Sequence, residues 1–197
     1  MDEGLLLWIN QGWAHPWLDV FFAWVSSRPA FALPFALFLG YWCYRNWGRQ
    51  GLIGWGLLLV TVGAGDFIGG LLKDLAQQPR PCFAIPELIR IPGYPAGTAC
   101  GPSLTGWPSN HTLNFCTVAA FLGLLTRDRR LGGMLFAIAL LVGLSRIYLA
   151  KHYPSQVAAG AVIGLSWGFL AAWLVSLRLR LERGPGMDNK TEDKANH

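Results

Sequence analysis

Two histidines and three cations recur at defined spacings in the middle and second half of the chain. They occur in three short segments: Lys73-x6-Arg80-Pro81, Pro108-Ser109-Asn110-His111 and Ser145-Arg146-x5-His152. Guanidinium and ammonium groups match the oxygens of a phosphate, while imidazoles serve as nucleophiles and proton donors. The set therefore predicts a site that binds phosphate and attacks phosphorus, provided that the fold brings the three segments together.

The overall composition departs from that of a soluble domain. Of the 197 residues, 53% are hydrophobic and only 14% are charged, whereas a soluble domain carries about 25% charged residues. This shortfall favours a membrane protein. The net charge is +5, but Lys and Arg lie between apolar segments and form no single basic face, which argues against nucleic-acid binding.

Six apolar segments are candidates to cross the membrane, which takes about 20 helical residues. They are 5–27, 31–44, 51–72, 110–126, 131–149 and 155–177. His15, Pro16 and Asp19 interrupt the first segment, so an interfacial helix over 4–13 before a shorter span is the alternative there. The sequence thus predicts an all-α, polytopic membrane helix bundle with six transmembrane helices over 1–183. A polar tail, 184–197, is predicted to be disordered.

The distribution of cations predicts the orientation. One side of the membrane would hold Arg45, Arg49, Arg127, Arg129, Arg130, Arg178, Arg180, Arg183, Lys190 and Lys194. The other would hold Arg28, Lys73, Arg80, Arg90, Arg146 and Lys151. Because Lys and Arg accumulate on the cytoplasmic side, we expect both termini in the cytoplasm and the phosphate site on the extracytoplasmic face. Arg28, Arg90 and Lys151 are interpreted as helix-end residues that reach the interface, without a catalytic role.

A long connection, 73–109, lies on the extracytoplasmic side and is rich in proline. It contains Cys82 and Cys100. Because extracytoplasmic compartments are oxidising, the sequence predicts a disulfide between them, with two free thiols as the alternative. Acidic residues on this face are few and lack the spacing of metal ligands, so neither a metal nor another cofactor is predicted.

The three segments resemble the signature motifs of the type-2 phosphatidic acid phosphatase superfamily, a group of integral-membrane lipid phosphatases. This group shares its core with vanadium haloperoxidases and glucose-6-phosphatase. The resemblance implies that His152 is the nucleophile, forming a phosphohistidine, and that His111 protonates the leaving group. It also implies a phosphate cradle made by Lys73, Arg80, Arg146, Ser109 and the backbone of Asn110, with Ser145 supporting Arg146.

Two positions depart from the family pattern. Asn110 stands where Gly is commonest, which requires only that its backbone N–H still points at the phosphate. Gln156 stands where most members carry an Asp that orients the nucleophile, although glucose-6-phosphatase also looks to carry Gln. We expect Gln156 Oε1 to accept a hydrogen bond from His152 Nδ1–H, leaving Nε2 free to attack.

An acidic residue inside the third apolar segment is interpreted separately. Asp66 precedes Lys73 by seven residues and therefore lies on the same helix face. Carboxylates within membranes usually face a partner in the bundle interior. We expect Asp66 to pair with Lys73 or with another buried donor, in a structural role.

The implied activity is metal-independent removal of phosphate from a membrane lipid, at the outer face of a bacterial cytoplasmic (inner) membrane. Undecaprenyl diphosphate is the first choice of substrate. The alternatives are phosphatidylglycerol phosphate, phosphatidic acid, a lipid A phosphate, and phosphoryl transfer to an acceptor lipid. A transporter or an anion-binding membrane protein with a degenerate site is the non-enzymatic alternative. The expected partners are the lipid substrate and the bilayer, and no oligomeric state is predicted.

Overall fold

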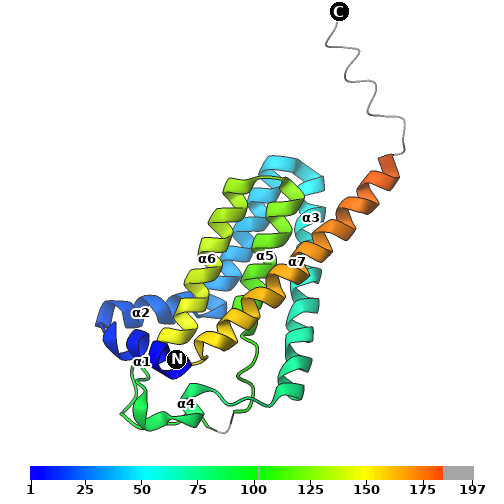
Figure 1. The fold of residues 1–197 in the computed structure, drawn as a ribbon. Coiled ribbons are helices and arrows are strands. Elements are labelled where there is room, and N and C mark those ends of the chain that lie inside the picture. The colour runs from blue at the N-terminus through cyan, green and yellow to red at the C-terminus, as the bar shows by residue number, and fades with distance from the viewer. Residues whose placement is uncertain (102, 184–197) are drawn as a thin grey trace, which may run out of the picture.

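The computed structural model describes residues 1–101 and 103–183, with side chains through Leu177. The predicted tail, 184–197, lies outside the described residues, so the division of the chain at residue 183 stays a prediction. All regular elements in the described part are helical (Figure 1): α1 (Asp2–Gly12), α2 (Pro16–Val25), the π-helical turn η1 (Arg28–Ala32), α3 (Leu33–Ala76), α4 (Pro81–Ala84), the 3-10 turn η2 (Pro86–Leu88), α5 (Asn110–Thr126), α6 (Arg129–Tyr148) and α7 (Pro154–Arg183).

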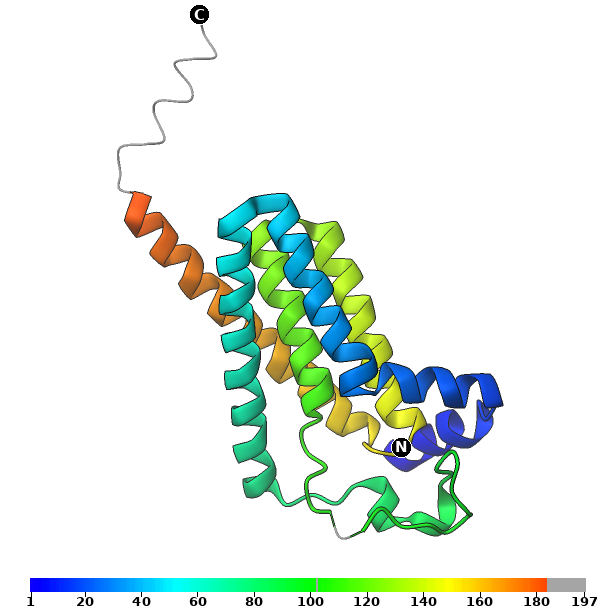
Figure 2. The ribbon, with the colours of Figure 1, turned by 180° about the vertical axis from the view of Figure 1, so that it is seen from behind.

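Helix α3 is a hairpin of two legs that correspond to the predicted spans 31–44 and 51–72. The legs meet at Gly48, whose φ of 56° and ψ of −136° are not helical. A side chain disfavours this positive φ, whereas glycine adopts it readily. Seen from behind, the two legs run in opposite directions beside α5 (Figure 2).

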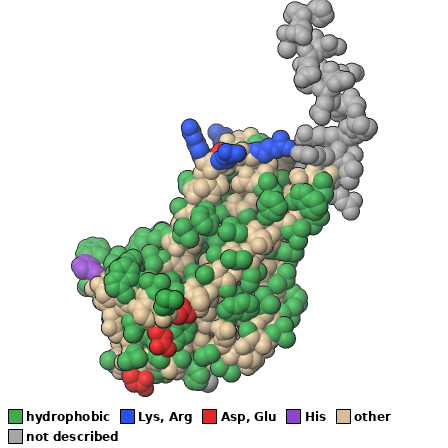
Figure 3. Space-filling model, viewed as in Figure 1, with side chains coloured by type: hydrophobic (Ala, Val, Ile, Leu, Met, Phe, Trp, Pro, Cys, Tyr) green, Lys and Arg blue, Asp and Glu red, His purple; other side chains and the backbone are tan. Residues whose placement is uncertain are grey.

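The long helices have the length and composition of membrane spans. Three helical stretches of the described chain qualify, with mean hydropathies of 1.7, 1.8 and 1.8: Arg28–Ala84, which contains both legs of α3, Arg129–Tyr148 and Pro154–Leu177. Helix α5 lies between them, packed against α3, α6 and α7. Hydrophobic side chains cover much of the visible surface (Figure 3). The prediction of an all-α, polytopic membrane bundle is confirmed.

The first apolar segment differs from a single crossing. It forms α1 and α2, which lie across one end of the long helices (Figures 1 and 2). The helix is interrupted at the polar residues noted in the sequence. Pro16 begins α2, and His15 caps this helix by accepting a hydrogen bond from the Trp17 backbone N–H. Ten residues of helix span about 15 Å, half the thickness of the hydrocarbon core. The alternative of a separate helix near 4–13 describes α1 better.

The N-terminal end of α1 lies beside the start of α7. The Asp2 carboxylate accepts hydrogen bonds from the backbone N–H and the hydroxyl of Ser155, at 2.9 and 2.5 Å. The start of the chain therefore lies at the beginning of α7, whereas Arg183 ends that helix at the opposite end of the bundle. Asp2 and Arg183 thus lie at opposite ends of α7, and the location of the two termini relative to the membrane stays a prediction.

Helices α5 and α7 approach closely along a seam of glycines. Cβ atoms added to Gly160, Gly164 and Gly168 would lie 2.5, 2.2 and 2.5 Å from the carbonyl oxygens of Ser109, Leu113 and Thr117. Both sets repeat every four residues, so the two helices present matching faces, as small residues commonly do within membranes. Thr117 also donates a hydrogen bond to the Gly164 carbonyl oxygen, at 3.2 Å. The seam fixes the start of α5 relative to α7.

The long connection between α3 and α5 is held at several points. Cys82 and Cys100 form the predicted disulfide, with Cα atoms 5.4 Å apart. The Cys100 backbone N–H also donates to the Cys82 carbonyl oxygen, at 3.0 Å. At its middle, the connection is bound to α1 by the buried side chain of Asn10, which accepts from the Arg90 backbone N–H and donates to the Arg90 carbonyl oxygen, both at 2.7 Å.

Arg90 makes a bidentate ion pair with Asp19 of α2, at 2.8 and 2.7 Å. It also donates to the Tyr148 hydroxyl at 2.9 Å, and that hydroxyl donates to Asp19 at 2.5 Å. The hydrogen bonds from Arg90 to Asp19 raise the pKa of Arg90 and outweigh the effect of desolvation, which lowers it. Arg90 is thus a structural anchor between the connection, α2 and α6. The sequence suggested only an interfacial cation.

The glycine seam generates a stability prediction. We expect Gly164→Ala to lower the unfolding free energy by about 1–3 kcal/mol, because the added Cβ would clash with backbone that cannot move freely. Thermal unfolding in detergent micelles measures the change. Gly133→Ala is the matched control: a Cβ there meets nothing within 4 Å, so helix propensity should leave stability equal or higher. Equal melting temperatures for the two variants would contradict the role of the seam.

Candidate active site

His152 lies in the short connection between α6 and α7, at the end of the bundle near α1. Ala150 has a φ of 51°, and the backbone N–H groups of Lys151 and His152 both donate to the Arg146 carbonyl oxygen, at 2.9 and 3.2 Å. This tight turn brings His152 back against the helix that carries Arg146. The His152 side chain is almost fully buried, with 2% of its surface exposed.

The bonds of the His152 ring define its tautomer. Nδ1 lies 2.8 Å from the Gly106 carbonyl oxygen and 3.3 Å from Gln156 Oε1. Because a carbonyl oxygen can only accept, Nδ1 carries the proton and the lone pair lies on Nε2. The expected contact from Gln156 is present, but the backbone of Gly106 supplies the shorter one. A backbone acceptor leaves no mark in side-chain spacing, so the sequence motifs did not identify Gly106.

Gln156 connects three parts of the site. Its Oε1 also accepts from the Tyr153 backbone N–H at 3.1 Å, and its Nε2 donates to the Pro79 carbonyl oxygen at 3.0 Å. Its own carbonyl oxygen accepts from the Ser109 backbone N–H at 3.0 Å. The Gln156 residue thereby joins the segments that carry Arg80, Ser109 and His152.

Lys73 and Asp66 do not bond each other in this structure. Lys73 Nζ donates to the carbonyl oxygens of Thr105, at 3.1 Å, and Pro108. Asp66 Oδ1 accepts from the side-chain amides of Asn110 and Asn114, at 3.0 and 2.9 Å. Asp66 thus pairs with other buried donors and ties α3 to the first turns of α5. Asn110 contributes a side-chain contact here that the motif comparison did not anticipate.

Arg146 is buried, with 5% of its surface exposed, and donates through Nη1 to the hydroxyl of Ser26 at the end of α2. The Nε atoms of Arg146 and Arg80 are buried and have no hydrogen-bond partner. Unpartnered buried donors are costly. An anion bound beside Arg80 and Arg146 would supply acceptors for these two atoms.

The two serines of the motifs make local contacts. Ser145 donates its hydroxyl to the Val142 carbonyl oxygen of its own helix, at 2.6 Å, and its predicted support of Arg146 stays a prediction. The fully buried Ser109 accepts from the Thr112 hydroxyl at 3.2 Å. Ser109 begins α5 as its N-cap residue. Free N–H groups of the first turn therefore face the same end of the bundle as His152.

His111 lies in the first turn of α5 and is half-buried, beside the backbone of Ser26 and within electrostatic range of Arg146, Arg28 and Lys151. A cavity of about 320 Å³ extends from His111, Arg28 and Asn114 between α5 and both legs of α3. Farther along, its walls are apolar and include Leu39, Trp55 and Leu58. One end of the cavity thus carries charge and an imidazole, and the remainder is hydrophobic.

The electrostatics of the site favour a neutral nucleophilic imidazole and a bound anion. Burial, followed by the charges of Arg146, Arg80 and Lys73, holds the pKa of His152 well below its usual range. Burial also lowers the pKa of Arg80. Within residues 1–101 and 103–177, the only ion pair is the one between Arg90 and Asp19. The cations around His152 therefore make no ion pair, although Asp66 lies within electrostatic range of Lys73.

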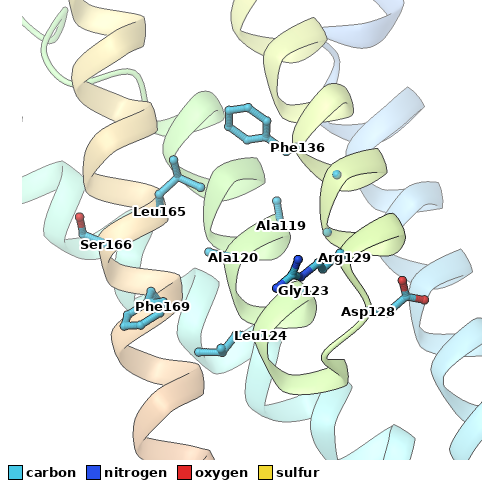
Figure 4. Close-up of a pocket in the computed structure, with 12 residues that line it drawn as sticks. Ala119, Ala120, Gly123, Leu124, Asp128, Arg129, Phe136, Leu165, Ser166 and Phe169 are labelled. Carbon is cyan, nitrogen blue, oxygen red and sulfur yellow. The ribbon is translucent and has the colours of Figure 1, made fainter.

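The structure brings the candidate residues Lys73, Arg80, Ser109, His111, Arg146 and His152 to one end of the bundle, from four separate segments. It adds Ser26 and Gly106, which the motifs did not contain. A larger cavity, of about 750 Å³, lies away from this end between α5, α6 and α7 (Figure 4). Its walls include Ala120, Gly123 and Phe136, and it contains no histidine. Size alone therefore does not locate the chemistry.

Comparison with known proteins agrees with this geometry. Residues 54–180 match the model of the PAP2 superfamily. A lipid A 4'-phosphatase of Porphyromonas gingivalis is 27% identical over 173 residues, which cover 85% of this chain and 70% of that protein. An undecaprenyl-diphosphatase of Bacillus subtilis is 32% identical over 111 residues, which cover 56% of this chain and 52% of that protein.

A solved structure has the same fold. It is the transmembrane PAP2-type phosphatidylglycerolphosphate phosphatase from Bacillus subtilis, with a TM-score of 0.62, 22% sequence identity, and coverage of 88% of this chain and 86% of that chain. The family model spans more than half of the sequence and includes every residue of the three motifs. This membrane protein therefore belongs to the PAP2 superfamily, whose phosphatases hydrolyse the phosphate esters of lipids.

Proposed function

We propose that the protein removes phosphate from a membrane lipid through a phosphohistidine on His152. The observation that carries the proposal is the state of this residue: a neutral imidazole, with Nδ1–H held by Gly106, among three cations without a carboxylate partner. Such an imidazole presents a nucleophilic Nε2 to an anion that the cations attract. An anion-binding protein would need the cations but not an oriented nucleophile.

The proposed reaction has two steps. His152 Nε2 attacks phosphorus, forming an N–P bond while the bond from phosphorus to the lipid oxygen breaks, and His111 gives its proton to that oxygen. Water then attacks the phosphohistidine, His111 takes the proton of the water, and inorganic phosphate leaves. Anionic substrate favours the protonated form of His111 that the first step requires. Lys73, Arg80 and Arg146 neutralise the charge that grows on the phosphoryl oxygens.

The apolar cavity beside His111 supports a lipid substrate. It has its polar end at the proposed proton donor and its hydrophobic walls along both legs of α3. We propose that the first part of the lipid chain lies in this cavity, while the phosphate lies between the arginines. Phe35 and Leu58 are among the side chains that would contact it.

Undecaprenyl diphosphate remains our first choice of substrate, supported by the similarity to the undecaprenyl-diphosphatase. The other relatives named above act on lipid A and on phosphatidylglycerol phosphate, which keeps both lipids as alternatives. The residues of the described part contain no group of three or more His, Cys, Asp and Glu suited to a metal. We propose that catalysis relies on the protein's own cations, because Arg146, Arg80 and Lys73 act on His152.

We also propose that the site faces the outside of a bacterial cytoplasmic membrane. Exposed arginines gather at the end of the bundle opposite the histidines (Figure 3): Arg45, Arg49, Arg127, Arg129 and Arg130. Cations flanking spans favour the cytoplasmic side. The disulfide in the connection at the other end also fits an oxidising compartment.

The first test is phosphate release by the purified protein in detergent with EDTA present. The lipids are undecaprenyl diphosphate, phosphatidylglycerol phosphate, phosphatidic acid and a lipid A phosphate. We expect release from at least one, with His152→Ala abolishing it because the nucleophile is lost. Rapid acid-free quenching should trap labelled phosphate on the wild-type protein but not on His152→Ala. Full activity of the alanine variant would refute the phosphohistidine, and no release by the folded wild-type protein would refute the enzyme.

The contacts of His152 Nδ1 predict unequal effects of its two acceptors. Gln156→Ala should lower kcat/KM only about fivefold, the value of one hydrogen bond, because Gly106 still holds Nδ1. Gly106→Ala should cost about 100-fold through displacement of the ring, since its Cβ would lie 2.5 Å from Gln156 Nε2 and 2.6 Å from the Pro79 oxygen. Gly63→Ala, where a Cβ meets nothing within 4 Å, is the control.

Steady-state kinetics on the preferred lipid measures these effects. An inactive Gln156→Ala would show that Gln156, and not Gly106, orients the ring. An unaffected Gln156→Ala would remove its orienting role altogether. Gln156→Asp tests whether the carboxylate common in the family improves on the amide.

The proposed proton donor predicts a dependence on the leaving group. His111→Ala should lower the rate about 10²–10⁴-fold for a lipid monophosphate, whose leaving alkoxide needs a proton. The loss should be smaller for a diphosphate, because the departing phosphate has a second pKa near 6 and leaves more easily without protonation. Initial rates on undecaprenyl phosphate and undecaprenyl diphosphate test this. Equal losses would show that His111 binds the substrate without donating a proton.

A further inference from the structure

Two cations beside the proposed site, Arg28 and Lys151, have no role in the reaction described above. Neither residue belongs to the three motifs, and neither forms an ion pair in the described part of the chain. Both lie within electrostatic range of His111. We infer that Arg28 and Lys151 determine specificity by binding a second anionic group of the substrate, on the leaving-group side of the reacting phosphate. This inference rests on the proposed function.

The position of Arg28 is fixed by the contact between α2 and α6. Ser26, at the end of α2, accepts a hydrogen bond from Arg146. Ser27 then caps the π-helical turn by accepting from the Ala30 backbone N–H at 3.2 Å, and Arg28 is the first residue of that turn. Ser26 thus contacts Arg146, which lies at the reacting phosphate. Two residues later, Arg28 lines the apolar cavity together with His111.

Lys151 is placed by the tight turn that also places His152. Its backbone N–H donates to the Arg146 carbonyl oxygen at 2.9 Å. Lys151 directly precedes His152, and its side chain is exposed and therefore accessible to a ligand. Desolvation and the neighbouring charges of Arg146 and Arg80 lower the pKa of Lys151. A cation held near two arginines is unfavourable unless an anion joins the group.

The number of charges exceeds what one phosphate requires. Lys73, Arg80 and Arg146 surround His152, and a phosphate monoester carries at most two negative charges. Asp66 offsets one of these positive charges, because its carboxylate keeps its charge while bonded to the neutral amides of Asn110 and Asn114 and lies within electrostatic range of Lys73. Arg28 and Lys151 add two more positive charges, on the side of His111.

The direction of the reaction places the second anion at that side. When His152 attacks the terminal phosphorus of a lipid diphosphate, the bond to the bridging oxygen breaks and the lipid monophosphate leaves. His111 lies on the leaving side, so the departing phosphate passes between His111, Arg28 and Lys151. The two cations stabilise its developing charge, which a lipid monophosphate with an alcohol leaving group would not present. The substrate class that matches the surplus is a lipid diphosphate.

The alternative is that both residues are ordinary interfacial cations, as the sequence suggested. An interfacial cation would affect lipids with one or two phosphates alike, through the general attraction of anionic headgroups. A specificity residue affects only the substrate that carries the second anion. The comparison of two substrates with the same chain separates these possibilities.

The test uses full-length protein in detergent micelles, with undecaprenyl diphosphate and undecaprenyl phosphate as substrates and initial phosphate release as the readout. Arg28→Gln and Lys151→Gln should each lower kcat/KM for the diphosphate about tenfold, the effect of one charged contact. The monophosphate should change by less than about threefold. Arg45→Gln, an exposed arginine at the other end of the bundle, is the control and should change neither rate.

Charge-conserving variants show whether a loss of activity comes from the loss of charge or from misfolding. Arg28→Lys and Lys151→Arg should keep most of the preference for the diphosphate, because the charge remains. Equal changes on both substrates would overturn the inference while leaving the phosphatase intact. A preference that survives Arg28→Gln and Lys151→Gln together would also overturn it. Absence of phosphate release by the wild-type protein from either lipid would instead overturn the proposed function, and the inference with it.

Discussion

The close contact of α5 and α7 is the constraint on which the site depends. Each helix carries one half of the chemistry at its start: Ser109 and His111 on α5, and His152 just before α7. Because glycines let the two backbones touch, their register is set by main-chain contacts as well as by side-chain packing. A slip by one helical turn would displace the two histidines relative to each other by about 5.4 Å, so that both could no longer reach the same phosphoryl group. Close packing of small residues of this kind holds helices together within a membrane.

At the same end of the bundle, buried cations repel one another. Arg146 is buried beside Arg80, without a carboxylate, and both Nε atoms lack an acceptor. Cations in a medium of low polarity repel each other more strongly than in water. The surrounding anchors, Asn10 and Arg90 among them, keep this arrangement from opening. An anion that enters the site relieves the repulsion, so ligand binding and stability of the folded state are linked.

Sequence patterns identified the parts of this protein that depend on side-chain type. The bounds of α5 agree with the predicted segment 110–126, and Cys82 pairs with Cys100 as expected. Sequence patterns do not identify functional backbone atoms. The Gly106 carbonyl oxygen, which orients His152, therefore could not be predicted from them. Hydropathy also favoured a single helix over the first apolar segment. It does not show that Asp19 pairs with Arg90, which lies 71 positions away in the sequence.

The disulfide has a consequence for the diversity of related proteins. It closes residues 82–100 into a ring whose base is fixed beside Arg80, while the chain that follows returns to Gly106 and α5. Changes of length or composition within the ring need not shift the base, because the crosslink absorbs them. The length and composition of the ring can therefore vary while the segments that carry Arg80 and Gly106 stay in place.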